Sequence, residues 1–274
     1  MNGPHADLQD RGDHLLVTLQ NPGRRNALVP AMYAVIRAAL DQAAAERRLG
    51  AVVLTGADGY FCAGGDLNAL RERAEMSRQD RRARIEELHG TIRAIRACPR
   101  PVIAAVEGGA AGAGLSIALA CDLLVAADDA RFSTAYVRVG LVPDGGLTAS
   151  LARRVPAGFA ARMCLTGDPV TAATLAAMGV VTDLAPPAEA VSRACELASR
   201  LAQGPRSTQA VIKRLLADAA GQDFDRQLDQ EAEAMADALA QEEAAEGISA
   251  RLNRLQPDFR RGDTPAQTVE EKRR

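Results

Sequence analysis

The sequence predicts an α/β protein in which buried strands alternate with helices. Two short apolar runs, at 51–55 and 102–106, have the length of buried strands. A glycine-rich turn follows each run, FCAGGDL at 61–67 and EGGAAGAGLS at 107–116, and each turn leads into a segment of helical character. Glycine tolerates φ > 0 and leaves main-chain N–H groups open to a ligand. A helix N-terminus adds unpaired N–H groups at the positive end of its dipole. Two such turns facing each other can hold one oxygen atom that becomes negative during a reaction, so the pattern indicates an enzyme with an oxyanion hole.

The other elements follow from periodicity and turn signals. Residues 14–20 are predicted as a first strand that ends at the turn Asn21-Pro22-Gly23, and the alanine-rich segment 30–48 has helical spacing of its apolar residues. Helices are also predicted at 67–75, at about 78–97 and from the second glycine turn through residue 120, with a strand at 123–126. Three consecutive helices follow without a strand, at 209–220, 223–240 and 246–255.

This organisation divides the chain into three parts. Residues 1–204 form the predicted catalytic core, 205–262 a helical oligomerisation region and 263–274 a polar, charged tail that is expected to be mobile. The stretch 223–246 is acidic, with Arg226 as its one basic residue. It is either a solvated helical face or a surface that packs on a neighbouring subunit.

Composition excludes several classes of protein. The chain has 274 residues and a net charge of −2, which favours neither disorder nor broad nucleic-acid binding. Its five scattered cysteines lack a CxxC pair and are typical of reduced thiols in a cytoplasmic protein. The acidic N-terminal segment does not have the pattern of a signal peptide, and no apolar run is long enough to span a membrane.

Motifs for several kinds of chemistry are also missing from the sequence. The three histidines form no HExxH pattern, and no His/Cys cluster has metal-ligand spacing, so no metal site is predicted. The glycines follow neither the dinucleotide-binding nor the P-loop pattern, and no serine lies in a G-x-S-x-G elbow. Catalysis is therefore expected to use backbone amides and a carboxylate.

Asp144, in the sequence LVPDGG at 141–146, is the candidate carboxylate. The alternative is structural, because Pro-Asp-Gly is turn chemistry and Asp is a common N-cap for a helix starting near Leu147. Asp66 has the same alternative, an N-cap after the first glycine turn, and its position favours that interpretation. Cys62 is interpreted as a small buried hydrophobic residue, because the sequence positions no histidine to activate it. Ser116 is a polar residue of a helix start, and Tyr136 belongs to the core or to a pocket lining.

Four motifs in order, NPGRRNAL, FCAGGDL, GGAAGAGLSIALACDLLVAADDARF and VGLVPDGG, resemble the enoyl-CoA hydratase/isomerase family, or crotonase superfamily, from about Leu15 to Phe259. The resemblance implies a spiral of ββα turns, a C-terminal helical region that builds trimers or hexamers, and an acyl-CoA thioester as substrate. It further implies that the amides of Gly65 and Ala113 hold the thioester oxygen.

The same resemblance assigns the remaining binding residues. A basic residue after the first strand, Arg24 or Arg25, is expected near the nucleotide end of coenzyme A, unless both are only a charged, exposed turn. The main chain of Ala63 is expected to contact the adenine. We assign Arg25, Ala63, Asp66, Ser116 and Tyr136 to substrate binding. No cofactor is expected, because coenzyme A is part of the substrate.

The sequence departs from the family pattern at the two glutamates that family hydratases use, which fall on Ser116 and Tyr136. Neither can act as a carboxylate base, so hydration by that mechanism is not expected. Asp144 falls where several family isomerases carry their base and where a dehalogenating relative carries a nucleophilic Asp. That relative also needs an aromatic-rich pocket and a histidine base. This chain has no tryptophan, and the sequence indicates no histidine near the matching positions.

The sequence therefore predicts an acyl-CoA isomerase with Asp144, Gly65 and Ala113 as catalytic residues, acting in fatty acid or aromatic acid degradation. It would shift a double bond or rearrange a ring-derived unsaturated acyl-CoA. A hydratase (a lyase) or CoA-thioester hydrolase is the alternative within the same class. A non-catalytic acyl-CoA-binding member is the alternative of another class. The expected assembly is a homotrimer or a dimer of trimers, with neither nucleic acid nor membrane as partner.

Overall fold

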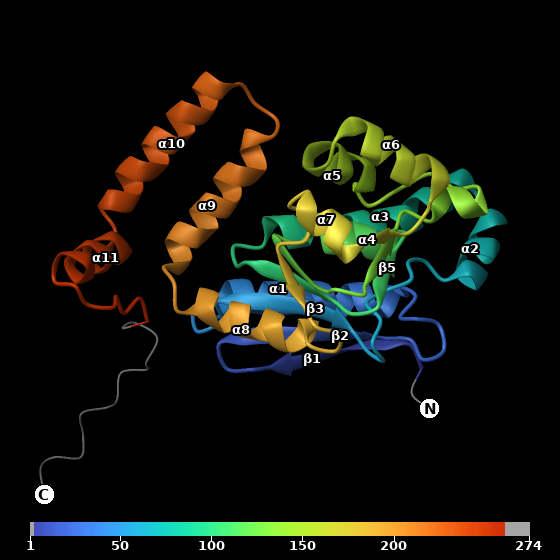
Figure 1. Ribbon diagram of the computed structural model, residues 1–274, viewed down its shortest axis with the longest axis horizontal. Coiled ribbons are helices and arrows are strands. Elements are labelled where there is room, and N and C mark those ends of the chain that lie inside the picture. The colour runs from blue at the N-terminus through green and yellow to red at the C-terminus, as the bar shows by residue number, and fades with distance from the viewer. Residues whose placement is uncertain (1–2, 261–274) are drawn as a thin grey trace, which may run out of the picture.

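The structure, a computed structural model, describes residues 3–260. Within them a main sheet has the strand order β1-β2-β3-β4-β6-β9 and a small sheet has the order β5-β7-β8 (Figure 1). The strands of the main sheet are β1 (His5–Asp10), β2 (His14–Gln20), β3 (Ala51–Gly56), β4 (Val102–Val106), β6 (Leu123–Ala127) and β9 (Asp183–Ala185). Those of the small sheet are β5 (Gly109–Ala111), β7 (Arg131–Ser133) and β8 (Val170–Thr171).

The main sheet is parallel except for the β1–β2 hairpin. Its central strands β3 and β4 are buried along their whole length, which explains why both are continuous apolar runs instead of alternating ones. Consecutive parallel strands end at the same edge of a sheet. The glycine turns that follow β3 and β4 therefore begin as neighbours.

Helices cover the sheet and then extend away from it. In chain order they are α1 (Pro30–Ala45), α2 (Leu67–Ala74), α3 (Arg78–Ala97), α4 (Ala113–Ala120), the 3₁₀ turn η1 (Tyr136–Val139), α5 (Leu147–Arg154), α6 (Ala157–Thr166), α7 (Ala172–Ala177), α8 (Ala190–Ala202), α9 (Arg206–Ala219), α10 (Phe224–Leu239) and α11 (Glu242–Leu252). Helix α1 packs on β1, β2 and β3, while α8 packs across β2, β3, β4 and β6. Helix α4 is buried at every position, so the second glycine turn leads directly into the core.

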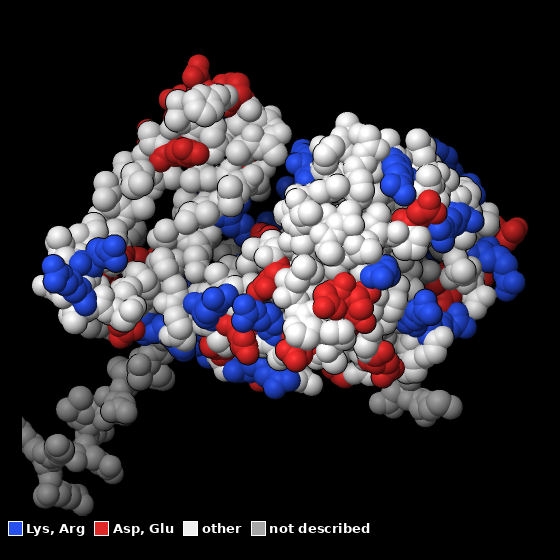
Figure 2. Space-filling model, in the orientation of Figure 1, with Lys and Arg blue, Asp and Glu red and all other residues white. Residues whose placement is uncertain are grey.

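The last three helices stand beside the core as an arm (Figure 1). Lys213 on α9 joins this arm to the core, because its Nζ lies 2.7 Å from the carboxylate of Asp122 and donates to the carbonyls of Ile95 and Arg100 at 3.1 and 3.2 Å. The arm leaves large apolar side chains exposed: Ile212, Leu216, Phe224, Leu228, Met235, Leu239, Ile248 and Leu252. Figure 2 shows that its visible face is mostly uncharged, whereas charges of both signs mix over the core.

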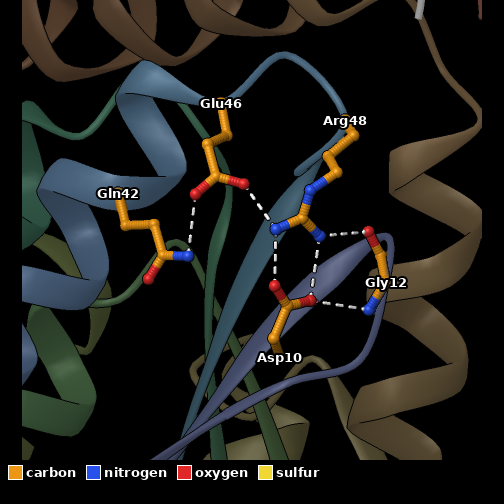
Figure 3. A network of polar contacts seen from close by, with 5 residues as sticks. All are labelled: Asp10, Gly12, Gln42, Glu46 and Arg48. Atoms are coloured by element: carbon orange, nitrogen blue, oxygen red, sulfur yellow. Dashed lines mark hydrogen bonds and ion pairs between the residues drawn. The ribbon is translucent and has the colours of Figure 1, made fainter. Parts of the chain in front are cut away.

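An exposed polar network joins the end of α1 to the first hairpin (Figure 3). The Arg48 guanidinium donates to the Asp10 carboxylate at 2.9 Å, to the Gly12 carbonyl at 2.9 Å and to Glu46. The Arg48 hydrogen bond, helped by the amide of Gly12, lowers the pKa of Asp10 to about 2. The network holds the β1–β2 turn against the loop that leads into β3.

The α/β fold class predicted from the sequence is confirmed, as are the strands at 14–20, 51–55 and 102–106 and the helix at 78–97. The sequence prediction missed β1 and the short strands β5, β7, β8 and β9. Strand β1 has the sequence HADLQD, and the last three of its residues are exposed. Few of its residues are apolar, so the sequence carries no strand pattern there. The predicted tail, 263–274, lies outside the described residues. No helix within 3–260 is long and apolar enough to cross a membrane.

Candidate active site

The two glycine turns pair with each other along their backbones. Cys62 forms a parallel bridge with Ala110: its amide donates to the carbonyl of Gly109, and its carbonyl accepts from the amide of Ala111 at 2.9 Å. At the next step, Gly64 lies against the start of α4 with φ +95°. A Cβ added to Gly64 would lie 2.8 Å from the Ala111 oxygen and 3.2 Å from the Ala113 nitrogen. Only glycine fits this backbone conformation and this spacing.

This pairing brings the predicted oxyanion-hole residues to one place. Ala113 is the first residue of α4, so its amide has no acceptor within the helix and points out of the helix N-terminus. Gly65 follows directly after Gly64 and is partly exposed. It is held by its bridge to Leu28, whose amide donates to the Gly64 carbonyl at 2.7 Å. The two turns therefore present adjacent backbone, as the sequence pattern predicted.

Asp144 lies at the same end of α4 as Ala113. Ser116, one turn into α4 and buried, donates from its hydroxyl to the Asp144 carbonyl at 3.0 Å. The Tyr136 hydroxyl donates to the Asp144 carboxylate at 2.7 Å and lies 3.2 Å from the Ser116 hydroxyl. The Tyr136 ring packs at Gly112, the residue before Ala113. The three side chains thus form one polar cluster beside the second glycine turn.

The electrostatics of this cluster keep Tyr136 protonated. Burial and the charge of the Asp144 carboxylate both raise the pKa of Tyr136, because each disfavours the phenolate. The phenol therefore remains a hydrogen-bond donor to Asp144 across the neutral range. Asp144 itself is only partly buried, which leaves part of the carboxylate accessible to a ligand.

Of the two structural alternatives for Asp144, a turn residue and an N-cap of the following helix, the structure shows the turn but not the N-cap. The N-cap position of α5 is Gly146, which has φ +75° and provides no side-chain cap. The Asp144 carbonyl, not its carboxylate, accepts from the Leu147 amide at 3.2 Å. The carboxylate is instead oriented by Tyr136.

The sequence predicted that no histidine would lie near this position, and this prediction is wrong. His89 on α3 accepts a hydrogen bond at Nε2 from the amide of Gly145, with 3.2 Å between the nitrogens. Fifty-six residues separate the two in sequence, so no local pattern could have revealed the contact. The lone pair that a general base would use is occupied by this amide. The lack of tryptophan still counts against the dehalogenase reading.

Asp66 is the N-cap of α2, as its position in the sequence favoured. Its carboxylate accepts from the amides of Asn68 and Ala69 at 2.9 and 3.1 Å, and Arg24 lies 2.5 Å away. Burial opposes ionisation, but the Ala69 amide and the Arg24 guanidinium outweigh it and lower the pKa of Asp66. These contacts give Asp66 a structural role, which holds the first glycine turn at the start of α2.

The two neighbouring arginines differ in their surroundings. Arg24 pairs with Asp66, whereas the exposed Arg25 lies over the Tyr60 ring at 5.3 Å from its centroid. The Ala63 amide already donates to the Arg25 carbonyl at 2.9 Å. Any further main-chain hydrogen bond from Ala63 to a ligand would therefore use its carbonyl.

Asn26 is a residue of this loop that the sequence interpretation did not single out. Its side chain is buried and donates to the carbonyls of Ala57 and Tyr60 at 2.8 and 2.6 Å, and it accepts from the Asn21 amide. It thereby fixes the loop that carries Arg25 against the first glycine turn. Nothing in the sequence indicated this role except that Asn26 belongs to the motif NPGRRNAL.

Cys62 is confirmed as a buried structural residue. Burial raises the pKa of its thiol to about 12, so it is protonated at neutral pH and a poor nucleophile. A Cβ at Gly114 would lie 2.8 Å from its sulfur, which shows how closely α4 packs on this turn. Among the described residues 3–260, no three His, Cys, Asp or Glu side chains form a group that could hold a metal ion.

Known proteins resemble this chain over most of its length. The model of the enoyl-CoA hydratase/isomerase family matches residues 13–262. The chain belongs to this family. The 2,3-dehydroadipyl-CoA hydratase of Escherichia coli strain K12 is 36% identical over 248 residues, 90% of this chain and 94% of that protein. The 1,2-epoxyphenylacetyl-CoA isomerase of the same strain is 32% identical over 246 residues, 89% of this chain and 94% of that protein.

Solved structures of the family share the fold. The crystal structure of an enoyl-CoA hydratase from Polaromonas sp. JS666 superposes with a TM-score of 0.91 at 39% identity, covering 93% of this chain and 99% of that one. The crotonase-like architecture predicted from the sequence is confirmed, and the chain is an acyl-CoA enzyme of the hydratase/isomerase family. Relatives at these identities include both a hydratase and an isomerase. Overall similarity therefore leaves the specific reaction open.

Proposed function

We propose that this enzyme is an acyl-CoA isomerase in which Asp144 is the single base. The observation that carries the proposal is the Asp144 carboxylate beside the start of α4, oriented by Tyr136 at 2.7 Å. A single carboxylate can take a proton from one carbon of the acyl chain and return it at another, which moves the double bond. Serine and tyrosine stand where hydratases of the family have glutamates, so a pair of carboxylates that activates water is not built from these positions.

In this proposal the amides of Gly65 and Ala113 bind the thioester oxygen. Removal of an α- or γ-proton places negative charge on that oxygen, and each oriented amide lowers the barrier by about 3–4 kcal/mol. The position of Ala113 at a helix N-terminus adds the favourable end of the α4 dipole. The close approach of Gly64 to Ala113 supports the two amides acting on one oxygen.

The coenzyme A end of the substrate is proposed to lie along the first glycine turn. Arg25 is exposed there and accessible to a phosphate, whereas Arg24 is already paired with Asp66. The Ala63 carbonyl is proposed to accept from the adenine amino group. The proposed chemistry uses no cofactor beyond the coenzyme A of the substrate.

A second copy of the chain is proposed to cover the apolar face of the C-terminal arm, giving a trimer or a dimer of trimers. The exposed apolar side chains of α9, α10 and α11 are unusual for a monomer's surface. Light scattering coupled to size-exclusion chromatography should give three or six times 28.8 kDa. A monomer at micromolar concentration would contradict this assembly.

The reaction can be tested with a panel of enoyl-CoA thioesters in D₂O, followed by mass spectrometry and NMR. The panel should include 2-enoyl and 3-enoyl chains and ring-containing acyl groups, since one relative is named an epoxyphenylacetyl-CoA isomerase. Isomerase activity predicts a moved double bond and deuterium incorporation, both lost in Asp144→Asn. Water addition that survives in Asp144→Asn would support the hydratase alternative. Coenzyme A binding without exchange or turnover would support a non-catalytic role.

A further inference from the structure

The peptide bond between Asp144 and Gly145 is held from two sides by side chains of other elements. Ser116 on α4 donates to its carbonyl oxygen at 3.0 Å, and His89 on α3 accepts from its N–H at 3.2 Å. Gly145 has φ +62°, and a Cβ there would lie 2.7 Å from the Cβ of Ser116. The loop is therefore held between α3 and α4. These contacts fix the backbone at Asp144 and with it the direction of the Asp144 side chain.

The hydrogen bond fixes the tautomer of His89. A ring nitrogen that accepts from an amide carries no proton, so in the neutral ring the proton must be on Nδ1. Nδ1 faces the carboxylate of Glu86, one turn earlier on α3, at 3.5 Å. Arg93 lies 3.0 Å from the same carboxylate and lowers the pKa of Glu86, which keeps it charged. Glu86 thus favours the tautomer that leaves Nε2 free to accept.

We propose that His89 is a positioning residue that holds Asp144 in its working orientation only while its imidazole is neutral. Protonation turns Nε2 into a donor that faces the Gly145 N–H, and two donors cannot hydrogen-bond to each other. The loop then loses its hydrogen bond to α3. The role in catalysis rests on the proposed function, but the contact between His89 and Gly145 does not.

Because the contact needs a neutral imidazole, the charged groups around His89 bear on it. On α3 the ring faces Glu86 and, behind it, Arg93. The opposite loop contacts the ring through the Gly145 amide, and the Asp144 carboxylate of that loop is hydrogen-bonded to the neutral Tyr136 phenol. Helix α4 presents the neutral Ser116. Helix α1 presents Arg37, which bonds instead to Glu87 and Thr91 on the other side of α3. Imidazole changes charge between pH 5 and 8 more readily than other side chains.

A direct test uses the amide of Gly145 as a reporter. Labelling with ¹³C-carbonyl aspartate and ¹⁵N-glycine selects amides that follow aspartate, and the sequence contains only Asp58-Gly59 and Asp144-Gly145. We expect the Gly145 amide signal to shift between pH 8 and pH 5 with the same midpoint as the His89 ring nitrogens. The Gly59 signal should stay in place. In His89→Gln, whose amide oxygen accepts at every pH, the Gly145 shift should disappear.

The kinetic test follows kcat/KM from pH 5 to pH 8 with trans-3-hexenoyl-CoA. The wild type should lose activity below the midpoint seen by NMR, and His89→Gln should keep its activity there. His89→Leu, which has no acceptor, should lower kcat roughly three- to tenfold at every pH with little change in KM. The proposal would be overturned if the Gly145 amide signal did not change as His89 titrates. It would also be overturned if kcat/KM of His89→Gln fell at low pH as it does in the wild type. If no enoyl-CoA is turned over, the proposed function fails, while the NMR experiment still decides the contact.

Discussion

The Tyr136 hydroxyl donates a 2.7 Å hydrogen bond to the Asp144 carboxylate, although the two side chains come from a 3₁₀ turn and from the loop that follows it. The same hydroxyl lies 3.2 Å from that of Ser116. The resemblance to family hydratases places their two glutamates at positions 116 and 136. In this chain both positions carry hydroxyl side chains, and both hydroxyls donate to Asp144.

Replacing Tyr136 by Phe removes the donor that orients Asp144. Hydrogen bonds to charged groups contribute about 1.5–3 kcal/mol, so kcat should fall roughly 10- to 100-fold with little change in KM. The comparison is made with Tyr60→Phe, which removes a hydroxyl near Arg25 instead. Equal kcat in Tyr136→Phe and wild type would show that the contact does not serve catalysis.

Replacing Gly64 by Ala should separate the two glycine turns. The new Cβ meets the Ala111 oxygen at 2.8 Å and the Ala113 nitrogen at 3.2 Å, in a backbone conformation of positive φ. The left-handed conformation alone costs about 1–2 kcal/mol. The matched control is Gly12→Ala, with φ +91° and nothing within 4 Å of the added Cβ. Thermal unfolding should show the larger loss for Gly64→Ala, and kcat should fall in that variant alone. Equal losses would mean that the turns do not meet as described.

Replacing Arg25 by Ala should weaken binding of the substrate without slowing the chemical step. An exposed guanidinium that contacts a phosphate contributes about 1 kcal/mol, so KM should rise roughly fivefold and the effect should shrink at high salt. Arg24→Ala is the control, because Arg24 is engaged with Asp66. Steady-state kinetics at two salt concentrations would test this. An unchanged KM in Arg25→Ala would show that Arg25 is only a charged, exposed turn residue.

Replacing Arg48 by Met should lower stability in a way that depends on pH. The pKa of Asp10 falls from 3.8 in the free group to about 2 in the folded protein. The stabilisation is therefore complete above about pH 4 and is lost as the pH falls through 2. Both side chains are about two-fifths exposed, so its size at neutral pH should not exceed about 1 kcal/mol, or a melting-temperature shift of about 2–4 °C.

Thermal melts of wild type, Arg48→Met, Asp10→Asn and the double variant would isolate this pair. The coupling between the two substitutions should shrink as the pH is lowered from 5 toward 2. A coupling that stays constant over this range would contradict the assignment of the network in Figure 3.

Several parts of the site could be read from the sequence because they depend on local backbone. Glycine at 64 and 112 marks turns that few other residues can form, and a buried strand before each turn places them at one edge of the sheet. The N-cap role of Asp66 was also visible, because a cap is a contact within three residues. The cap suggested for Asp144 was wrong, since glycines at 145 and 146 turn the chain before α5 begins.

The sequence by itself determined the fold class and the meeting of the two glycine turns, because these are fixed by residue type and by short-range backbone geometry. The tertiary structure decided what surrounds Asp144. It brought His89, Ser116 and Tyr136 from three elements to one loop. His89 is 56 residues from Gly145 in sequence, and Ser116 and Tyr136 are 28 and 8 residues from Asp144. Contacts of this kind arise when helices pack on a shared core, and they leave no periodic signal in the chain.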